Sequence, residues 1–289
     1  MGGSVAVVVP CFNDGGTLEE AVASALSQDV PTEIIVVDDG TTDSATVAAF
    51  GRLESAGVRI IHQVNQGPAP ARMTGVRATA ADYVYPLDAD DVLATGALRR
   101  LSDVLDRNPE VAAAWGSVAC FGKLDYVHRS RPSLDPWQVS YQNHLPLGSL
   151  YRRSVLIEVG GWQLPGGYED WDLWMSLAEC GWQGIGIPDV IAHYRVRNGR
   201  RLSRSARRHA ERCAKLRARH PTLFAQRSTN LRSSPAPLLL KLALPTIDAL
   251  PFSPTRKRLL GGAMTHIAYR HGLRTMVARY RAHRVLRGA

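Results

Sequence analysis

Residues 5–14 read Val-Ala-Val-Val-Val-Pro-Cys-Phe-Asn-Asp, an apolar run that ends abruptly in polar residues. The same pattern returns at residues 34–39, Ile-Ile-Val-Val-Asp-Asp, and at residues 83–91, Tyr-Val-Tyr-Pro-Leu-Asp-Ala-Asp-Asp. Runs without polar alternation are typical of strands covered on both faces, and residues 17–28 and 69–80 between them are long enough for helices. The pattern predicts an α/β fold with an open, mostly parallel sheet flanked by helices.

Acidic residues follow the predicted strands. In open α/β sheets the carboxyl ends of parallel strands meet at one edge, where ligands bind. Asp88-Ala89-Asp90 continues an extended segment, so the two-residue strand period predicts both carboxylates on one side. Carboxylates hold hard divalent cations, which neutralise phosphate groups, and we expect a Mn²⁺ or Mg²⁺ ion here. Alone, such a pair is also typical of a solvated turn or a helix cap.

A second acidic cluster, Glu169-Asp170, stands in the first turn of a helix predicted over residues 168–180. A carboxylate there can act as a general base that removes a proton from a hydroxyl. The alternative is an acid that only stabilises the helix N-terminus. We favour the base for Asp170 and the helix-terminal role for Asp172.

Five short motifs occur in a fixed order. They are Val-Val-Val-Pro-Cys-Phe-Asn (7–13), Val-Asp-Asp-Gly-Thr-Thr-Asp (37–43), the Asn-Gln-Gly to Ala-Arg-Met-Thr-Gly segment (65–75), Leu-Asp-Ala-Asp-Asp (87–91), and Gly-Gly-Trp (160–162) before Glu-Asp-Trp-Asp-Leu-Trp (169–174). In this order they resemble the family-2 glycosyltransferases with the GT-A fold, over residues 4–205. The resemblance implies transfer of a sugar from a nucleotide-diphosphate donor, with a UDP-type donor favoured, to an acceptor hydroxyl.

The resemblance also implies roles in donor binding. Pro10 and Phe12 would flank the nucleotide base, and Asp39 would accept a hydrogen bond from it. Arg72 would lie near the base or the phosphates. Within Asp88-Ala89-Asp90, Asp90 would be the direct metal ligand and Asp88 would contact the ribose, or the metal through water.

On the acceptor side, the resemblance matches Asp170 to the catalytic base, which implies single displacement with inversion and no enzyme nucleophile. Glu169, Trp162 and Tyr168 are predicted to bind the acceptor, which is a glycan, a lipid-linked sugar or a small natural product. Tryptophans of this kind more often pack a helix against a sheet. His144 is predicted to be a surface histidine in a loop facing the acceptor.

Two positions depart from the family pattern. Arg197 stands where relatives often carry a metal-binding histidine after Tyr-Arg-x, and we expect it to contact phosphate instead. Met73 replaces the usual asparagine after Arg72. The Gln-x-x-Arg-Trp motif and membrane helices of the processive members are missing from this sequence, so we expect one sugar to be added per encounter.

The net charge of +9 conceals an uneven distribution. Residues 1–198 carry 14 Lys and Arg against 24 Asp and Glu, whereas residues 199–289 carry 21 against 2. We predict a catalytic domain over residues 1–205, with donor-binding (1–92) and acceptor-binding (93–205) parts, and a basic helical extension over 206–289. The extension is predicted to contact an anionic membrane surface rather than nucleic acid. A solvated arginine-rich tail is the equally weighted alternative.

No apolar run of about 18 residues occurs, so we expect no transmembrane helix. The four cysteines form no C-x-x-C pair, which favours a reducing compartment and a cytoplasmic protein. If the basic extension binds lipid, we expect the protein at the inner face of the membrane. Two rival functions remain open. A nucleotidyltransferase usually has a glycine-rich basic loop after its first strand, whereas residues 10–14 are acidic. A non-enzymatic protein could use the basic extension to bind anionic surfaces.

Overall fold

The computed structural model describes residues 2–122, 125–196 and 208–269; Arg197 lies outside the described residues. The strands are β1 (Val5–Cys11), β2 (Thr32–Asp38), β3 (Arg59–His62), β4 (Tyr83–Pro86), β5 (Val92–Leu93), β6 (Val111–Gly122), β7 (Tyr126–His128), β8 (Leu150–Arg152) and β9 (Gln183–Val196). The helices among the described residues up to 196 are α1 (Gly15–Leu26), α2 (Ser44–Ser55), α3 (Pro68–Ala78), α4 (Ala97–Arg107), α5 (Pro136–Val139), α6 (Arg153–Glu158) and α7 (Glu169–Glu179). The extension forms α9 (His209–Arg219), α10 (Pro221–Ala225), α11 (Arg227–Ser233), α12 (Leu238–Ala249) and α13 (Pro254–Ala268).

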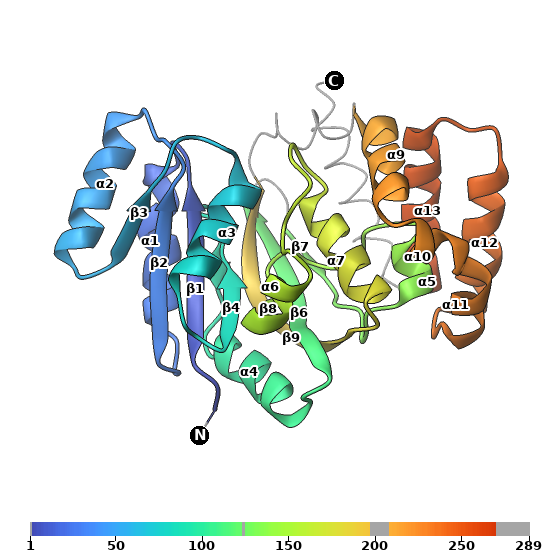
Figure 1. Ribbon diagram of the computed structural model, residues 1–289, viewed down its shortest axis with the longest axis horizontal. Coiled ribbons are helices and arrows are strands. Elements are labelled where there is room, and N and C mark those ends of the chain that lie inside the picture. Colours follow the sequence, from blue (N-terminus) through green and yellow to red (C-terminus); the bar gives the residue numbers. More distant parts are fainter. Residues whose placement is uncertain (1, 123–124, 197–207, 270–289) are drawn as a thin grey trace.

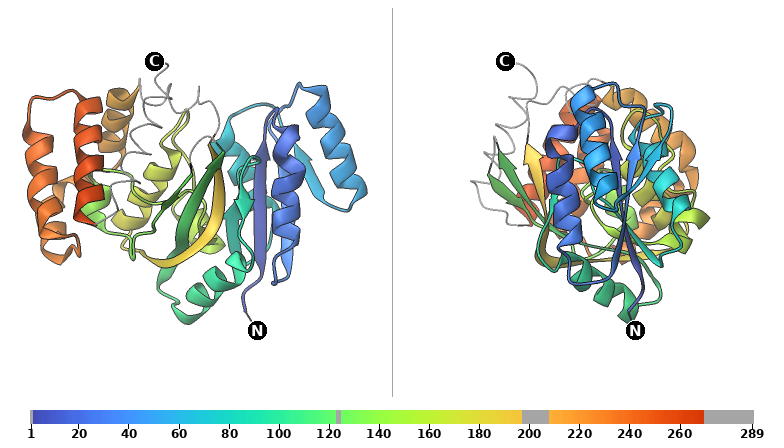
Figure 2. Two further views of the ribbon diagram at one scale, coloured as in Figure 1. Left: turned by 180° about the vertical axis from the view of Figure 1, so that it is seen from behind. Right: turned by 90° about the vertical axis from the view of Figure 1, so that its left-hand side faces the viewer.

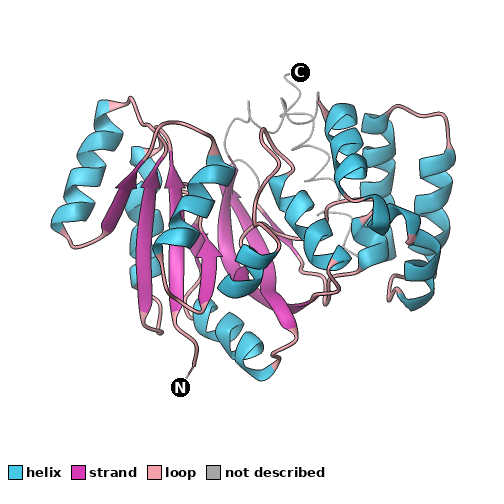
Figure 3. Ribbon diagram, viewed as in Figure 1, coloured by secondary structure: helices cyan, strands magenta, loops and turns pink. Residues whose placement is uncertain are grey.

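The strands form one mixed sheet in the order β3-β2-β1-β4-β8-β6-β9-β5, with β7 paired to β6. The first four strands are parallel, as the Val/Ile runs predict. From β4 onward the sheet is mixed, because β8 pairs antiparallel with both β4 and β6, and β5 pairs antiparallel with β9. Figure 3 shows the sheet between helices, with the last helices gathered beyond its far edge.

Helices cover both faces of this sheet. Alternate residues of β1 point to opposite faces: Val5, Val7 and Val9 pack with α1, α2 and α4, whereas Val8 packs with α3, α6 and α7 on the other face. The two sides can be followed in the views from behind and from the edge (Figure 2). Because β1, β2 and β4 are buried on both sides, an unbroken apolar run is the pattern that these strands require.

The helices of the extension pack in two places. Leu216 of α9 and Leu223 of α10 belong to the same apolar cluster as α7. A separate cluster joins Leu240 and Leu244 of α12 to Trp137 of α5. The predicted helical character of the extension is confirmed over its described part. No helix among the described residues is long and apolar enough to cross a membrane.

Asp172 stands in the first turn of α7, as predicted, and has a further role. Its carboxylate is fully buried and accepts hydrogen bonds from Arg219 at 2.7 and 3.1 Å, and lies 3.0 Å from Nε2 of His220. Both partners come from the end of α9 and the residue that follows it. Asp172 therefore also fastens the extension to the first turn of α7, in addition to the helix-terminal position that we expected.

Candidate active site

The carboxyl ends of β1, β2 and β4 meet at the upper edge of the sheet in Figure 1, as predicted. Asp39, directly after β2, is 3% exposed. Its Oδ1 accepts hydrogen bonds from the backbone N–H of Gln66 at 2.9 Å and from the side chain of Gln63 at 2.8 Å, and its Oδ2 accepts from the N–H of Gly67 at 2.8 Å. Asp39 thus holds the loop that leads into α3. Its predicted contact with a nucleotide base stays a prediction.

Pro10 and Phe12 lie at the end of β1, beside this loop. The Phe12 side chain is 45% exposed, which is unusual for a large apolar residue at the end of a buried strand. An exposed ring at a ligand-binding edge leaves a face open for stacking, so the position is compatible with the predicted contact to the base.

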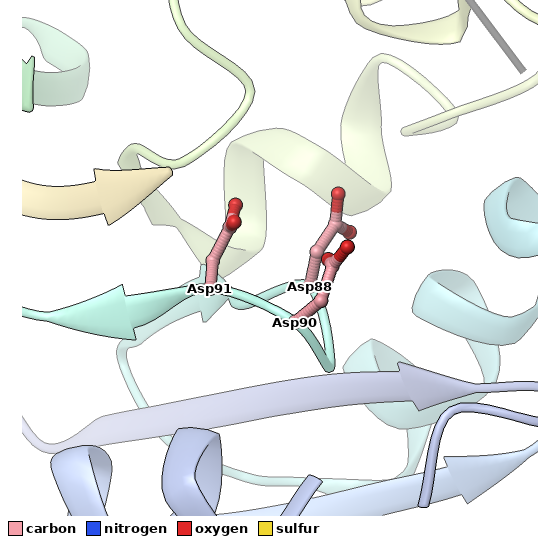
Figure 4. Close-up of side chains that lie close together, drawn as sticks. All are labelled: Asp88, Asp90 and Asp91. Atoms are coloured by element: carbon pink, nitrogen blue, oxygen red, sulfur yellow. The ribbon is translucent and has the colours of Figure 1, made fainter. Parts of the chain in front are cut away.

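The chain turns at residues 88–91, and we call this segment, which carries Asp88, Asp90 and Asp91, the acidic turn. The N–H of Asp91 donates to the carbonyl of Asp88 at 3.0 Å, so the segment is a turn rather than the extended strand from which we argued. The carboxylates converge because the chain bends here, and not through the strand period. One carboxylate oxygen from each of the three residues lies within 4.8 Å of the others, and Figure 4 shows their side chains together.

The acidic turn fits a divalent cation. Burial, together with the negative charges of Asp88 and Asp90, raises the pKa of Asp91 to about 8. Three convergent carboxylates that repel one another are stabilised when a cation is placed between them, and oxygen ligands suit Mn²⁺ and Mg²⁺. Asp91 was not among the predicted ligands, although it stands next to them in the motif.

Arg195, in β9, holds the acidic turn in place. Its backbone N–H donates to Oδ1 of Asp91 and its Nε donates to the carbonyl of Asp90, both at 3.0 Å. Its guanidinium also pairs with Glu20 of α1 at 2.5 Å. Apart from the Tyr-Arg pair that precedes Val196, no sequence signal indicates this role.

Arg72, in α3, connects the acidic turn to the second acidic cluster. Its guanidinium is 1% exposed and lies 2.7 Å from Asp88 Oδ1 and 3.2 Å from Glu169 Oε1. Burial acts to lower the pKa of Arg72, but the two carboxylates overcome it and raise the pKa above the usual value. Arg72 and Glu169 are thus paired with each other, and their predicted contacts with donor and acceptor stay untested.

Asp170 stands beside this ion pair in the first turn of α7. Burial, together with the negative charge of Glu169, raises its pKa to about 6. The turn before the helix is unusual, because Gly166, Gly167 and Tyr168 all have positive φ, at 83°, 113° and 72°. A non-glycine residue in this region is uncommon and is often found at functional sites.

Two predictions about the acceptor side need correction or revision. His144 is buried, 8% exposed, and burial lowers its pKa to about 4, so it is not the surface histidine that we expected. Trp162 is 2% exposed and packs edge-on against Tyr151, with the two ring centres 5.6 Å apart. A sugar could therefore stack on Trp162 only after the tryptophan ring moved. Tyr168 is half-buried, and its hydroxyl lies 2.7 Å from Nδ1 of His209.

The sequence of this chain matches a known protein family over the part that carries the donor side of the site. The sequence pattern described as "Glycosyl transferase family 2" matches residues 6–161, which include β1, the acidic turn and Arg72. The chain belongs to glycosyl transferase family 2. This match confirms the resemblance that was drawn from the five motifs, and it assigns the chain to the glycosyltransferases as an enzyme class.

Curated relatives match this family-2 chain over part of their lengths. "Uncharacterized glycosyltransferase EpsJ" of Bacillus subtilis is 36% identical over 36% of the chain and 31% of its own length. An N-acetylglucosaminyltransferase of Bradyrhizobium elkanii is 34% identical over 40% of the chain and 66% of its own length. The chain therefore spans less than two thirds of either relative.

Solved structures show the same fold at low sequence identity. Residues 1–349 of Staphylococcus aureus TarS, in complex with UDP-GlcNAc, match with a TM-score of 0.59 and 16% identity, over 96% of this chain and 79% of that one. The mannosyltransferase PcManGT of Pyrobaculum calidifontis, in complex with GDP-Man and Mn²⁺, matches with a TM-score of 0.56 and 21% identity, over 99% and 87%. Both are glycosyltransferases, and the predicted GT-A architecture is confirmed.

Proposed function

We propose that this family-2 chain transfers one sugar from a nucleotide-diphosphate donor to an acceptor hydroxyl, with inversion at the sugar carbon. The observation that carries the proposal is the connection through Arg72. A single buried guanidinium contacts both Asp88 of the acidic turn and Glu169, the neighbour of Asp170. The predicted diphosphate site and the predicted base therefore lie on two sides of one side chain.

On the donor side, Pro10 and Phe12 flank the base, and Asp39 orients the loop beside it. Asp90 and Asp88 would hold a divalent cation, which would supply positive charge to neutralise the departing diphosphate. Asp91 and Arg195 keep the carboxylates of the acidic turn converging on one point. The Mn²⁺ present in the PcManGT complex supports this choice of ion.

On the acceptor side, Asp170 takes the proton of the attacking hydroxyl. A base with a pKa of about 6 is ionised at neutral pH and still basic enough to accept a proton as the new bond forms. The hydroxyl oxygen attacks the sugar carbon from the face opposite the diphosphate, so the bond to the diphosphate breaks as the new one forms. Single displacement of this kind inverts the carbon and needs no enzyme nucleophile.

The donor is tested by a panel that includes UDP-GlcNAc and GDP-mannose, each with Mn²⁺, scored by the shift in melting temperature and then by product analysis. We favour a UDP-type donor, which the UDP-GlcNAc of the TarS complex supports. Release of nucleoside diphosphate is the expected result, and Asp170→Asn should bind donor but lose turnover. Release of pyrophosphate would instead indicate a nucleotidyltransferase. Full turnover by Asp170→Asn would remove Asp170 as the base.

We also propose that the extension, residues 206–289, places the enzyme on an anionic membrane, where a lipid-linked acceptor would be found. Leu238 and Leu242 of α12, one turn apart, are 71% and 64% exposed. The only two acidic residues after position 198, Glu211 and Asp248, are both paired with basic neighbours, at 2.8 and 2.9 Å. An apolar helix face in a region of surplus positive charge suits the interface of an anionic bilayer.

Co-sedimentation with vesicles of phosphatidylglycerol or of phosphatidylcholine tests this surface. The Leu238→Ser/Leu242→Ser variant should lose binding to anionic vesicles, whereas Val47→Ser, which changes a 53% exposed residue of α2, should not. Equal binding to both vesicle types, or dimerisation that the leucine substitutions abolish, would contradict a membrane role. α9 and α10 share the apolar cluster of α7, so the position between residues 205 and 206 does not separate two hydrophobic cores. We keep it only as a proposed boundary between functions.

A further inference from the structure

We propose that Asn143 is a positioning residue for the catalytic base, and that it selects which oxygen of Asp170 receives the proton. The inference rests on the proposed role of Asp170. Asn143 belongs to the loop between α5 and β8, 27 residues before Asp170 in the sequence. Neither the five motifs nor the match to the family, which covers residues 6–161, gives it a role.

The geometry fixes both ends of the Asn143 amide. Its Nδ2 donates to Oδ2 of Asp170 at 2.6 Å, and its Oδ1 accepts from the backbone N–H of Leu145 at 3.2 Å. Because an N–H can only donate, the bond to Leu145 decides which end of the amide is oxygen and turns the NH₂ group toward Asp170. Because Asn143 donates to Oδ2, we assign Oδ1 as the oxygen that receives the proton of the acceptor hydroxyl.

The extension holds the loop that carries Asn143. Next to Asn143, the side chain of Gln142 donates to the Thr265 hydroxyl of α13. In the same loop, the Ser140 hydroxyl accepts a hydrogen bond from Nε of Arg227 of α11 at 2.9 Å. The guanidinium of Arg227 also lies 3.8 Å from the centre of the Tyr141 ring. The base is thus held through a loop that both the catalytic part and the extension support.

The charged groups that face Asp170 make the contribution of Asn143 measurable. Burial and the negative charge of Glu169 raise the pKa of Asp170, whereas the backbone N–H of Trp171 and the guanidinium of Arg72 lower it. The Tyr151 hydroxyl of β8 also lies within electrostatic reach. The Asn143 amide lowers the pKa of Asp170 as well, because it donates to the ionised form. Removing the donor while Asp170 stays buried should therefore raise the pH at which the base becomes active.

The test is the pH dependence of kcat, at saturating Mn²⁺ and UDP-GlcNAc, or GDP-mannose if the melting shifts select it. Asn143→Leu keeps the size of the side chain and removes the donor. We expect its acidic limb to move up by about one pH unit from about pH 6, with a roughly fivefold loss of kcat at pH 6 that is largely recovered at pH 8.5. Asn143→Ala should move the limb in the same direction. Asn230→Leu, on α11 and outside the site, should leave the limb in place.

Recovery at high pH separates this role from a folding defect, because a misfolded variant would be inactive at every pH. If the limb stays where it is in both Asn143 variants while Asp170→Asn is inactive, Asn143 does not position the base and the inference is wrong. If Asp170→Asn keeps full activity, the proposed function fails instead, and the two failures are told apart.

Discussion

Arg72 is the residue on which the site depends most. It comes from α3, which begins at the loop held by Asp39, and it reaches both Asp88 and Glu169. Its place in the donor half was predicted from the motif at residues 65–75. Its pairing with Glu169 could not be, because that partner lies 97 residues further along the chain.

Replacing Arg72 by Met should destabilise the protein by about 3 kcal/mol, because it leaves two partly buried carboxylates without a counter-charge. Arg72→Met/Glu169→Gln should lose less, since one of those charges is also removed. The matched control is Arg99→Met, which breaks a half-exposed pair with Asp29 and should cost about 0–1 kcal/mol. Urea unfolding measures all three. An equal loss in Arg72→Met and Arg99→Met would contradict the connecting role of Arg72.

The rate of transfer should depend on pH through Asp170. Only the ionised carboxylate can accept the hydroxyl proton, so the rate should rise as pH increases through about 6 and fall away below it. A profile of kcat from pH 5 to 8, with saturating Mn²⁺ and donor, measures this limb. A rate independent of pH over that range would be inconsistent with a base of this pKa.

At the scale of elements, α7 carries the base and is fastened by residues from the extension. Its bounds were predicted closely, as residues 168–180 against Glu169–Glu179. The partners of Asp172 were not predicted, because Arg219 and His220 lie 47 and 48 residues away and basic residues in an arginine-rich tail give no signal of burial. The spacing of apolar residues within a short segment predicts a helix. The ion pairs of that helix depend on segments that are distant in the sequence.

His220 should make the stability of this contact depend on pH. Burial acts to lower its pKa, but the carboxylates of Asp172 and Glu179 outweigh burial and raise it. A raised histidine pKa contributes stability that is fully present below the unfolded value of 6.5 and is lost as pH rises through the folded value. The melting temperature of the wild type should therefore fall, relative to that of His220→Gln, between pH 6 and 8.5. Parallel curves for the two proteins would contradict this.

At the scale of the whole molecule, the first half was more predictable than the second. The unbroken Val and Ile runs of β1, β2 and β4 define a parallel sheet and the edge where the site forms. The mixed half could not be predicted, because β5 and β8 have only two and three residues and carry no readable period. The acidic turn was found from its composition, although the argument from strand geometry was wrong and Asp91 was missed.

Mn²⁺ binding in the presence of UDP, followed by the electron paramagnetic resonance signal of the free ion, tests the central claim most directly. The account predicts that the wild type and Asp170→Asn both bind Mn²⁺, whereas Asp90→Ala loses binding because the acidic turn loses its main ligand. Unchanged Mn²⁺ binding by Asp90→Ala would show that the cation, if it is used at all, is held elsewhere, and would contradict the proposed site.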